Sequence, residues 1–216
     1  MKERPILFSA PMIQAILDGR KNMTRRVVKK IYPEKEPSRH FSPGPCPHGQ
    51  PGDRLWVREA WRVGSWREDD GQIAVDYKAG PICRTKWLTV PDPDKFNDLW
   101  EGSTQEAEAA YGIKERYKWK PGESPCRWRP SLFMPRWASR ITLEITAVRV
   151  ERVQDISADD AWAEGFGIYD LPNAPIASYY GAVAKFHNTW NSLNLKRGYG
   201  WDANPFVWTI TFKRLP

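Results

Sequence analysis

The apolar positions of the chain predict short β-strands with few helices between them. Residues 6–8 form a short apolar strand. Ser9 and an early proline then precede apolar residues at helical spacing, which stop at Gly19 and predict a short helix. After a Pro-Gly-Asp turn at 51–53, apolar residues alternate from Arg54 to Trp61, which predicts a second strand.

The second half of the chain contains the clearest strand pattern. Apolar and polar residues alternate over 140–153, with a bulge expected near Ala147. The segment 157–160, SADD, resembles a helix capping box and predicts a short helix that ends at Gly165. A third helix is marked by apolar residues at helical spacing, and a closing strand by alternation over 206–212. The helix positions are Val183, Phe186, Trp190 and Leu193.

The regions between these elements are less regular. Six prolines fall within 31–52 and predict a loop. Turn signals, among them Pro91-Asp92-Pro93, interrupt a weakly periodic stretch at about 64–130. We interpret 64–130 as an elaboration inserted into a single domain that spans 1–216. Because strands and helices do not alternate regularly, we expect an α+β fold. Its core would be a small antiparallel β-barrel with a few short helices, not a doubly wound parallel sheet.

Charge is distributed unevenly over the 216 residues. The chain has 33 Lys and Arg against 26 Asp and Glu, a net charge of +7. Residues 1–40 carry 10 basic and 4 acidic side chains, and 114–140 carry 8 and 2, so each segment is +6 and the rest sums to −5. Such segments favour a phosphate-bearing partner, RNA or DNA, and the alternative is a solvated basic surface.

Aromatic residues strengthen the prediction that 114–140 contacts RNA or DNA. The chain has 12 Trp, and within this segment cations alternate with Tyr117, Trp119, Trp128 and Trp137. Bases stack on such rings, although aromatic side chains also serve as core. Two readings of this segment therefore stay open.

Several classes of protein are disfavoured. The longest run without a charged residue, 171–184, contains two prolines and is shorter than the roughly 18 to 20 residues of a membrane span. No signal-peptide pattern is present, so we expect a cytoplasmic protein. The only zinc candidates are Cys46, His48, nearby His40 and distant Cys126, with no Cys-x-x-Cys pair. No metal or other cofactor is expected.

The segment 19–26, GRKNMTRR, resembles the signature loop of ASCH domains in the PUA-like superfamily. Further similar segments are PGDRLWV at 51–57, the strand and short helix up to Gly165, and VWTITF at 207–212. The resemblance covers somewhat more than half of the chain and implies a pseudo-barrel with a cleft beside the signature loop. The layout, including RWASR at 136–140, is also similar to proteins carried by phages and prophages.

The resemblance implies binding of RNA, DNA or a modified nucleoside in that cleft. It also implies an alternative: some small ASCH proteins are amidohydrolases that remove an acyl group from the exocyclic amine of cytidine, and others are ribonucleases. The amidohydrolase pattern falls on Lys21, Thr24 and Glu164. The expected ligand-binding residues are Arg20, Arg25, Arg26, Arg58, Arg136 and Trp137. A further alternative is a phage accessory protein whose insertion binds a host protein.

The chemistry of these residues permits catalysis. Neighbouring cations and burial disfavour the ammonium form of Lys21, and a neutral lysine can act as base or nucleophile. Thr24 would hold a water molecule or supply the activated hydroxyl, Glu164 would transfer a proton, and Arg26 would stabilise an oxyanion. The alternative is structural: Lys21 and Arg26 bind phosphate, and Glu164 pairs with one of them.

Overall fold

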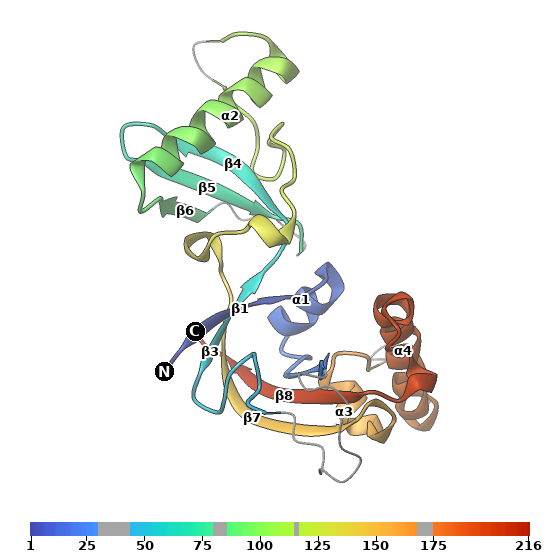
Figure 1. Ribbon diagram of the computed structural model, residues 1–216. Helices are drawn as coiled ribbons and strands as arrows, with labels where there is room; N and C mark the ends of the chain where they lie inside the picture. The colour runs from blue at the N-terminus through green and yellow to red at the C-terminus, as the bar shows by residue number, and fades with distance from the viewer. Residues whose placement is uncertain (30–43, 80–85, 115–116, 168–174) are drawn as a thin grey trace. The chain divides into compact units, whose positions relative to one another are not determined.

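The chain folds into two compact units in the computed structural model, which describes residues 1–29, 44–79, 86–114, 117–167 and 175–216. The first unit comprises 1–4, 15–55 and 142–216, and the second comprises 5–14 and 56–141. The stretch predicted as an elaboration, 64–130, falls within the second unit. Three elements continue from one unit into the other, namely β1 (Glu3–Leu7), α1 (Ala10–Leu17) and β3 (Arg54–Arg58) (Figure 1).

A five-stranded sheet has the order β1-β3-β7-β8-β2. Its later strands are β2 (Met23–Val27), β7 (Thr142–Arg152) and β8 (Phe206–Arg214), and β8 pairs antiparallel with both β2 and β7. The α+β class and the antiparallel pairing are thus confirmed. Among the described strands, however, the sheet is open and does not close into the predicted barrel.

The long strand β7 contains the predicted bulge. Its register against β8 shifts between Ile145 and Ala147, so Ile145 faces Phe212 and Val148 faces Ile210. Because side chains alternate along a strand, one extra residue exchanges the two faces of β7 beyond this point. Arg149 and Glu151 therefore lie on the same sheet face as Thr209 and Arg25, whose backbones are paired across β8.

Two helices cover that face of the first unit (Figure 1). Helix α3 (Ala158–Ala163) begins at Ser157, whose hydroxyl accepts a hydrogen bond from the Asp160 N–H, and the chain turns at Gly165 with φ +90°. Helix α4 (Pro175–Asn194) buries two of the four predicted apolar positions and exposes 56% of Leu193, which is not a core residue. The buried cluster comprises Val153, Ile156, Ala161, Ala182, Phe186, Trp190 and Val207.

Short 3-10 turns complete this unit at Val153–Asp155, Leu195–Arg197 and Trp201–Ala203. The predicted loop at 31–52 lies partly outside the described residues, and its described part, 44–52, contains no helix or strand. The zinc candidate His40 lies outside them altogether.

The second unit has its own three-stranded antiparallel sheet, in the order β4-β5-β6. The strands are β4 (Trp61–Arg67), β5 (Gln72–Tyr77) and β6 (Lys86–Thr89), and α2 (Pro93–Tyr111) lies along the sheet (Figure 1). The core contains Trp61, Val63, Ile73, Val75, Tyr77, Val90, Phe96, Cys126, Met134 and Ala138. Two 3-10 turns, Ser131–Phe133 and Arg136–Ala138, follow.

Two predictions fail in the second unit. The strand expected over 54–61 is interrupted, since β3 ends at Arg58 and β4 begins at Trp61. The Pro91-Asp92-Pro93 segment is a helix start and not only a turn. The Asp92 carboxylate accepts hydrogen bonds from the Asp94 and Lys95 N–H groups, and Pro93 takes the first helical position, where its missing N–H costs nothing.

No helix among the described residues combines the length and apolar character that crossing a membrane requires.

Candidate functional site

Lys21 and Glu164 meet inside the first unit, although they lie 143 positions apart in the sequence. Lys21 Nζ donates to Glu164 Oε2 at 2.7 Å, to the Glu164 carbonyl oxygen at 2.9 Å and to the Met23 carbonyl oxygen at 2.6 Å. The Lys21 side chain is fully covered, and that of Glu164 is 3% exposed. Three acceptors match the three protons of an ammonium group, so each N–H of a charged Lys21 has a partner.

Two glycine-terminated helices create this meeting. Gly19, with φ +75°, follows the end of α1, and the N–H groups of Arg20 and Lys21 then both donate to the Ala15 carbonyl oxygen. Gly165 ends α3 beside Lys21. A Cβ atom at Gly165 would lie 3.0 Å from the Ala15 Cβ and 3.3 Å from the Lys21 Cβ, so glycine is required there for both conformation and space.

Arg25 extends the cluster toward β7 and α3. Its fully covered guanidinium contacts three carboxylates: Glu151 at 2.5 Å, Asp160 at 2.5 Å and Glu164 at 3.4 Å. Arg149 in turn donates to Glu151 at 2.8 Å and to Asp160 at 2.5 Å. We call this set the buried charge network: Lys21, Arg25, Arg149, Glu151, Asp160 and Glu164. Its centre is covered, whereas Arg149 lies at its edge with 44% of its side chain exposed. Its three cations and three carboxylates give a formal charge of zero.

Burial and pairing act in opposite directions on the pKa values of the network. Burial lowers the pKa of Lys21, while the Glu164 carboxylate raises it and only partly compensates. For Glu151, burial raises the pKa, but hydrogen bonds from Arg149 and Thr209 and the charge of Arg25 outweigh that effect, and the net pKa is lowered. Glu151 therefore stays ionised at neutral pH.

The remaining predicted catalytic residue, Thr24, is buried in β2, where it pairs with Ile210. Strand alternation places its side chain on the face opposite to that of Arg25. The structure thus brings Lys21 and Glu164 into contact, whereas Thr24 stands apart from the buried charge network.

The predicted ligand-binding residues of the first unit occupy different environments. Arg20 is partly exposed and pairs with Asp18 at 2.7 Å. Arg25 is fully covered and engaged by carboxylates, so it does not present a free cation at the surface. Burial lowers the pKa of Arg26, and the charge of Glu164 opposes that shift, so Arg26 lies within electrostatic reach of Glu164.

The other three predicted ligand-binding residues belong to the second unit. Arg58 stacks over the Trp56 ring at 4.6 Å and donates to the Leu132 carbonyl oxygen at 3.2 Å. Arg136 is exposed in the second 3-10 turn. Trp137 packs edge-on against Trp61, with ring centroids 6.1 Å apart, and contributes to the core.

A second buried ion pair lies in this unit. The Arg140 guanidinium donates to both oxygens of Glu59 at 2.9 Å, and Glu59 is 1% exposed. Burial raises the pKa of Glu59, with the Arg140 charge acting against it. Arg140 also lies over the Tyr77 ring, 4.2 Å from its centroid, and Tyr77 donates to the Ala138 carbonyl oxygen. Every partner here is internal, as expected of a structural pair.

Within the described ranges, no group of three or more His, Cys, Asp or Glu side chains is arranged to hold a metal ion. Cys46 and Cys126 are free thiols. Burial and two arginines, Arg26 and Arg4, lower the pKa of His48 to about 4, so its imidazole is neutral at pH 7.

Sequence reasoning missed Arg149, Glu151, Asp160 and Thr209 as members or supports of the central cluster. One signal was present: Arg149 and Glu151 continue, at every second residue, the apolar row that begins at Leu143. Asp160 was assigned only to a helix cap. Its contact with Arg25, 135 positions away, depends on how α3 packs against the sheet.

Comparison with protein family models, curated protein sequences and solved structures found no match for this chain. The resemblance to ASCH domains therefore stays a prediction.

Proposed function

We propose that the chain is an ASCH-type protein with a PUA-like first unit that binds a modified nucleoside beside Lys21 and Glu164. The reaction proposed there is hydrolysis of an acyl group from the exocyclic amine. The observation that carries the proposal is the buried contact between Lys21 Nζ and Glu164 Oε2 at 2.7 Å. Burying two charges is costly, and strongly perturbed buried pairs are more frequent at functional sites than elsewhere.

The pair supplies a proton pathway for this reaction. Transfer of a proton from Lys21 to Glu164 leaves a neutral amine, and burial favours this step because it lowers the Lys21 pKa. The amine takes a proton from water as the water oxygen attacks the amide carbon. Glu164 then gives its proton to the departing exocyclic nitrogen, which releases the free nucleoside and a carboxylic acid. Arg26 is the proposed stabiliser of the oxyanion.

The rest of the network supports the pair. Arg25 contacts the second oxygen of Glu164 at 3.4 Å and is itself held by Glu151 and Asp160. This arrangement fixes the orientation of the Glu164 carboxylate. Thr24 is given no part in this step, because strand alternation places its side chain on the sheet face opposite to that of Arg25.

The test is hydrolysis of N4-acetylcytidine, followed by chromatography of the released cytidine. We expect turnover by the wild-type protein and a loss of at least about 100-fold in Lys21→Met/Glu164→Gln, since general acid–base groups contribute about 10²- to 10⁴-fold. The double substitution removes both charges together, so neither is left buried alone, and Gln retains an oxygen for Arg25.

Two controls accompany this assay. Circular dichroism and the melting temperature of the double variant report whether it folds. Asp18→Asn, at an exposed carboxylate that pairs with Arg20, should keep wild-type turnover. The proposal fails if the wild-type protein releases no cytidine, or if the folded double variant is equally active. Cleavage of an RNA oligonucleotide that depends on Lys21 would replace it with the ribonuclease alternative.

A further inference from the structure

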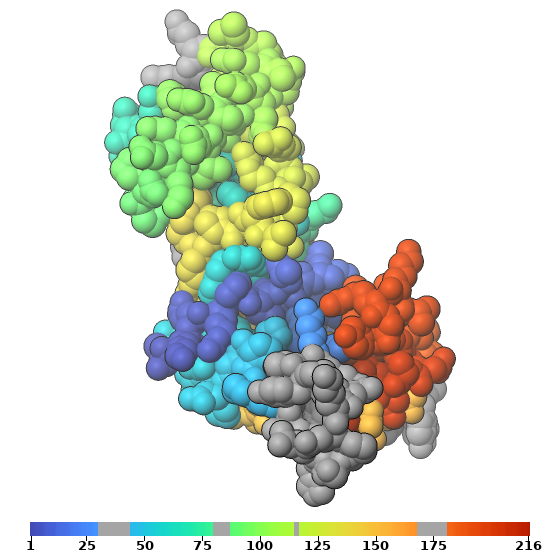
Figure 2. All heavy atoms as spheres, in the orientation of Figure 1, coloured from blue at the N-terminus to red at the C-terminus, as the bar shows by residue number. Residues whose placement is uncertain are grey.

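The second unit carries an exposed strip of aromatic and basic side chains at the C-terminal end of α2 and along β4. We name it the aromatic–basic strip and define it by Tyr111, Lys114, Lys118, Lys120, Arg127 and Trp128. Atoms of 117–140, in yellow, lie beside those of α2, in green (Figure 2). Exposure is 46% for Tyr111 and 36% for Trp128, which is unusual for rings of this size.

The rings of the strip are held in place by contacts within the second unit. The Trp119 indole N–H donates to the Gly64 carbonyl oxygen of β4 at 2.5 Å. The Trp119 ring lies 5.6 Å from that of Trp66 and stacks on Tyr111, with centroids 6.4 Å apart and planes at 22°. Arg62 stacks on Trp128 at 4.6 Å. The exposed rings are therefore preorganised, which reduces the entropic cost of binding.

Cations of the strip are available at the surface. Lys118 and Lys120 are exposed, and no carboxylate in the described part of the chain forms an ion pair with either. Arg127 pairs with Glu106 at 2.8 Å, yet 79% of its side chain is exposed. Two other surface cations of this unit are paired, Lys95 with Asp92 at 3.0 Å and Arg67 with Asp70 at 3.9 Å.

The charge of the second unit is segregated toward the segment 114–140, which contains every residue of the strip except Tyr111. Residues 56–141 contain 15 basic and 13 acidic side chains, and 5–14 contain none of either kind. Since 114–140 holds 8 basic and 2 acidic residues, the remainder of the unit holds 7 and 11, a net charge of −4 against +6. An anionic ligand is thus directed to one part of the unit.

We propose that the aromatic–basic strip binds single-stranded nucleic acid, independently of the reaction assigned to Lys21 and Glu164. Lysines and Arg127 contact phosphates, while unpaired bases stack on the exposed parts of Tyr111 and Trp128. A duplex keeps its bases stacked on one another and would use only the cations, so the exposed rings favour a single strand. RNA and DNA share this chemistry.

The experiment is fluorescence anisotropy of labelled U and dT oligonucleotides of about 12 nucleotides with the full-length protein. At about 50 mM salt we expect Tyr111→Ala/Trp128→Ala to weaken binding at least about 5-fold per ring. Lys118→Ala/Lys120→Ala should also weaken it, and should reduce the slope of log K against log salt by about 1.4, the value for two lost phosphate contacts.

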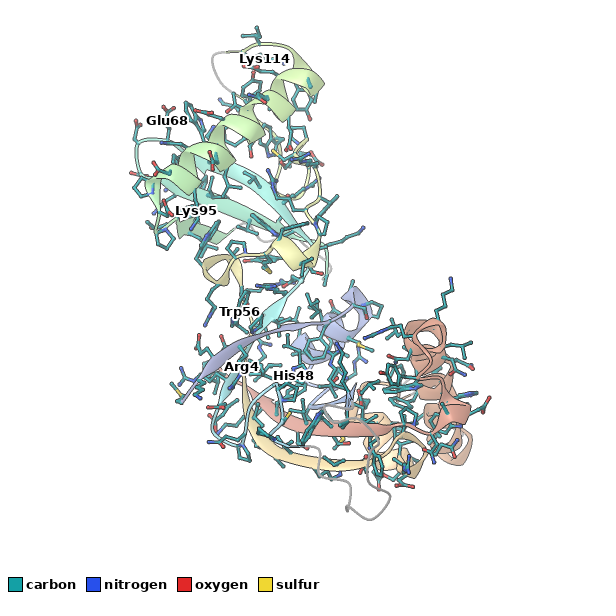
Figure 3. All side chains as sticks on the ribbon, in the orientation of Figure 1. Arg4, His48, Trp56, Glu68, Lys95 and Lys114 are labelled. Carbon is teal, nitrogen blue, oxygen red and sulfur yellow. The ribbon has the colours of Figure 1, made fainter. Side chains whose placement is uncertain are left out.

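The matched control is Lys78→Ala/Lys95→Ala, which removes the same charge from exposed positions of the same unit. Lys95 lies near the start of α2 and Lys114 follows its end (Figure 3). This control should bind like the wild-type protein. Lys21→Met/Glu164→Gln should also bind normally, so failure of hydrolysis and failure of oligonucleotide binding are separate results.

Four outcomes would overturn the proposal: no binding, a flat salt response, equal loss in the matched control, or a blunt duplex of the same length bound as tightly as the single strand. Comparison of the U and dT arms identifies the preferred polymer. Capture of a protein partner by the strip in the absence of oligonucleotide binding would favour a protein-binding surface instead.

Discussion

The two basic segments carry the same net charge of +6, but the cations at their proposed sites lie in different environments. In residues 1–40, Lys21 and Arg25 turn inward and meet carboxylates, and their side chains have no exposed surface. In 114–140, Lys118 and Lys120 stay at the surface. Charge counted along a sequence therefore does not reveal how much of it is available to a partner. Availability depends on which acids the fold brings to each cation.

The largest expected effect comes from removing the central cation of the first unit. Arg25→Met leaves Glu151, Asp160 and Glu164 short of a positive charge in a covered site, so we expect a loss of about 3 to 5 kcal/mol in the free energy of unfolding. Urea denaturation measures it. Arg25→Lys keeps the charge but loses the fork geometry, and should cost less. A change below about 1 kcal/mol in Arg25→Met would show that the network is solvated.

The next effect concerns pH. Burial, together with the charges of Arg26 and Arg4, lowers the folded-state pKa of His48 to about 4, below the ordinary 6.5. As pH falls from 6.5 to 4, the unfolded chain takes up a proton that the folded protein resists, so stability present above pH 6.5 is lost by an amount on the order of 3 kcal/mol. His48→Gln should remove this part of the pH dependence of urea unfolding. Unchanged dependence in the variant would assign it to other groups.

Gly165→Ala tests the contact between α3 and Lys21. We expect a loss of about 2 kcal/mol, because alanine is strained at φ +90° and its Cβ would crowd Ala15 at 3.0 Å. Gly198→Ala is the matched control, since Gly198 has φ +79° but an added Cβ would meet nothing within 4 Å. Thermal denaturation of both variants separates crowding from strain. Equal losses would mean that the close approach contributes nothing.

The smallest effect is expected in the aromatic–basic strip. Lys118→Ala/Lys120→Ala should change the free energy of unfolding by less than about 0.5 kcal/mol, because exposed side chains without partners contribute little to the folded state. The same urea measurement that reports the Arg25 variants applies here. A large loss would place these lysines in a structural role and erase the contrast between the two segments.

Much of the first unit was predictable because its signals are local. The capping pattern at Ser157, the glycine stops and the alternation of β7 and β8 each involve neighbours in sequence, and the structure confirms them. In the second unit, α2 was missed because it has few apolar residues and Gly102 interrupts it. Its packing on the sheet overrides that weak propensity, and its start was interpreted as a turn.

The site was predictable only in part, for a related reason. The pairing of Lys21 with Glu164 was suggested by resemblance, and the structure places the two in contact. Arg25 was expected to bind a ligand, but its carboxylate partners lie 126, 135 and 139 positions away. Only the strand register and the packing of α3 on the sheet determine these partners. Long-range partners of a charged residue leave no periodic trace in a sequence.

The bulge in β7 has a consequence for how sequence change can act on this protein. Up to Ile145, every second side chain of the strand is apolar and faces one side of the sheet. After Ala147, Arg149 and Glu151 face the opposite side, because the extra residue shifts the alternation by one position. An insertion or deletion of one residue nearby would exchange the apolar row of side chains for the charged row, although it changes the composition by a single residue only. Which ion pairs form in the first unit is thus determined by the number of residues in β7 as much as by their identity.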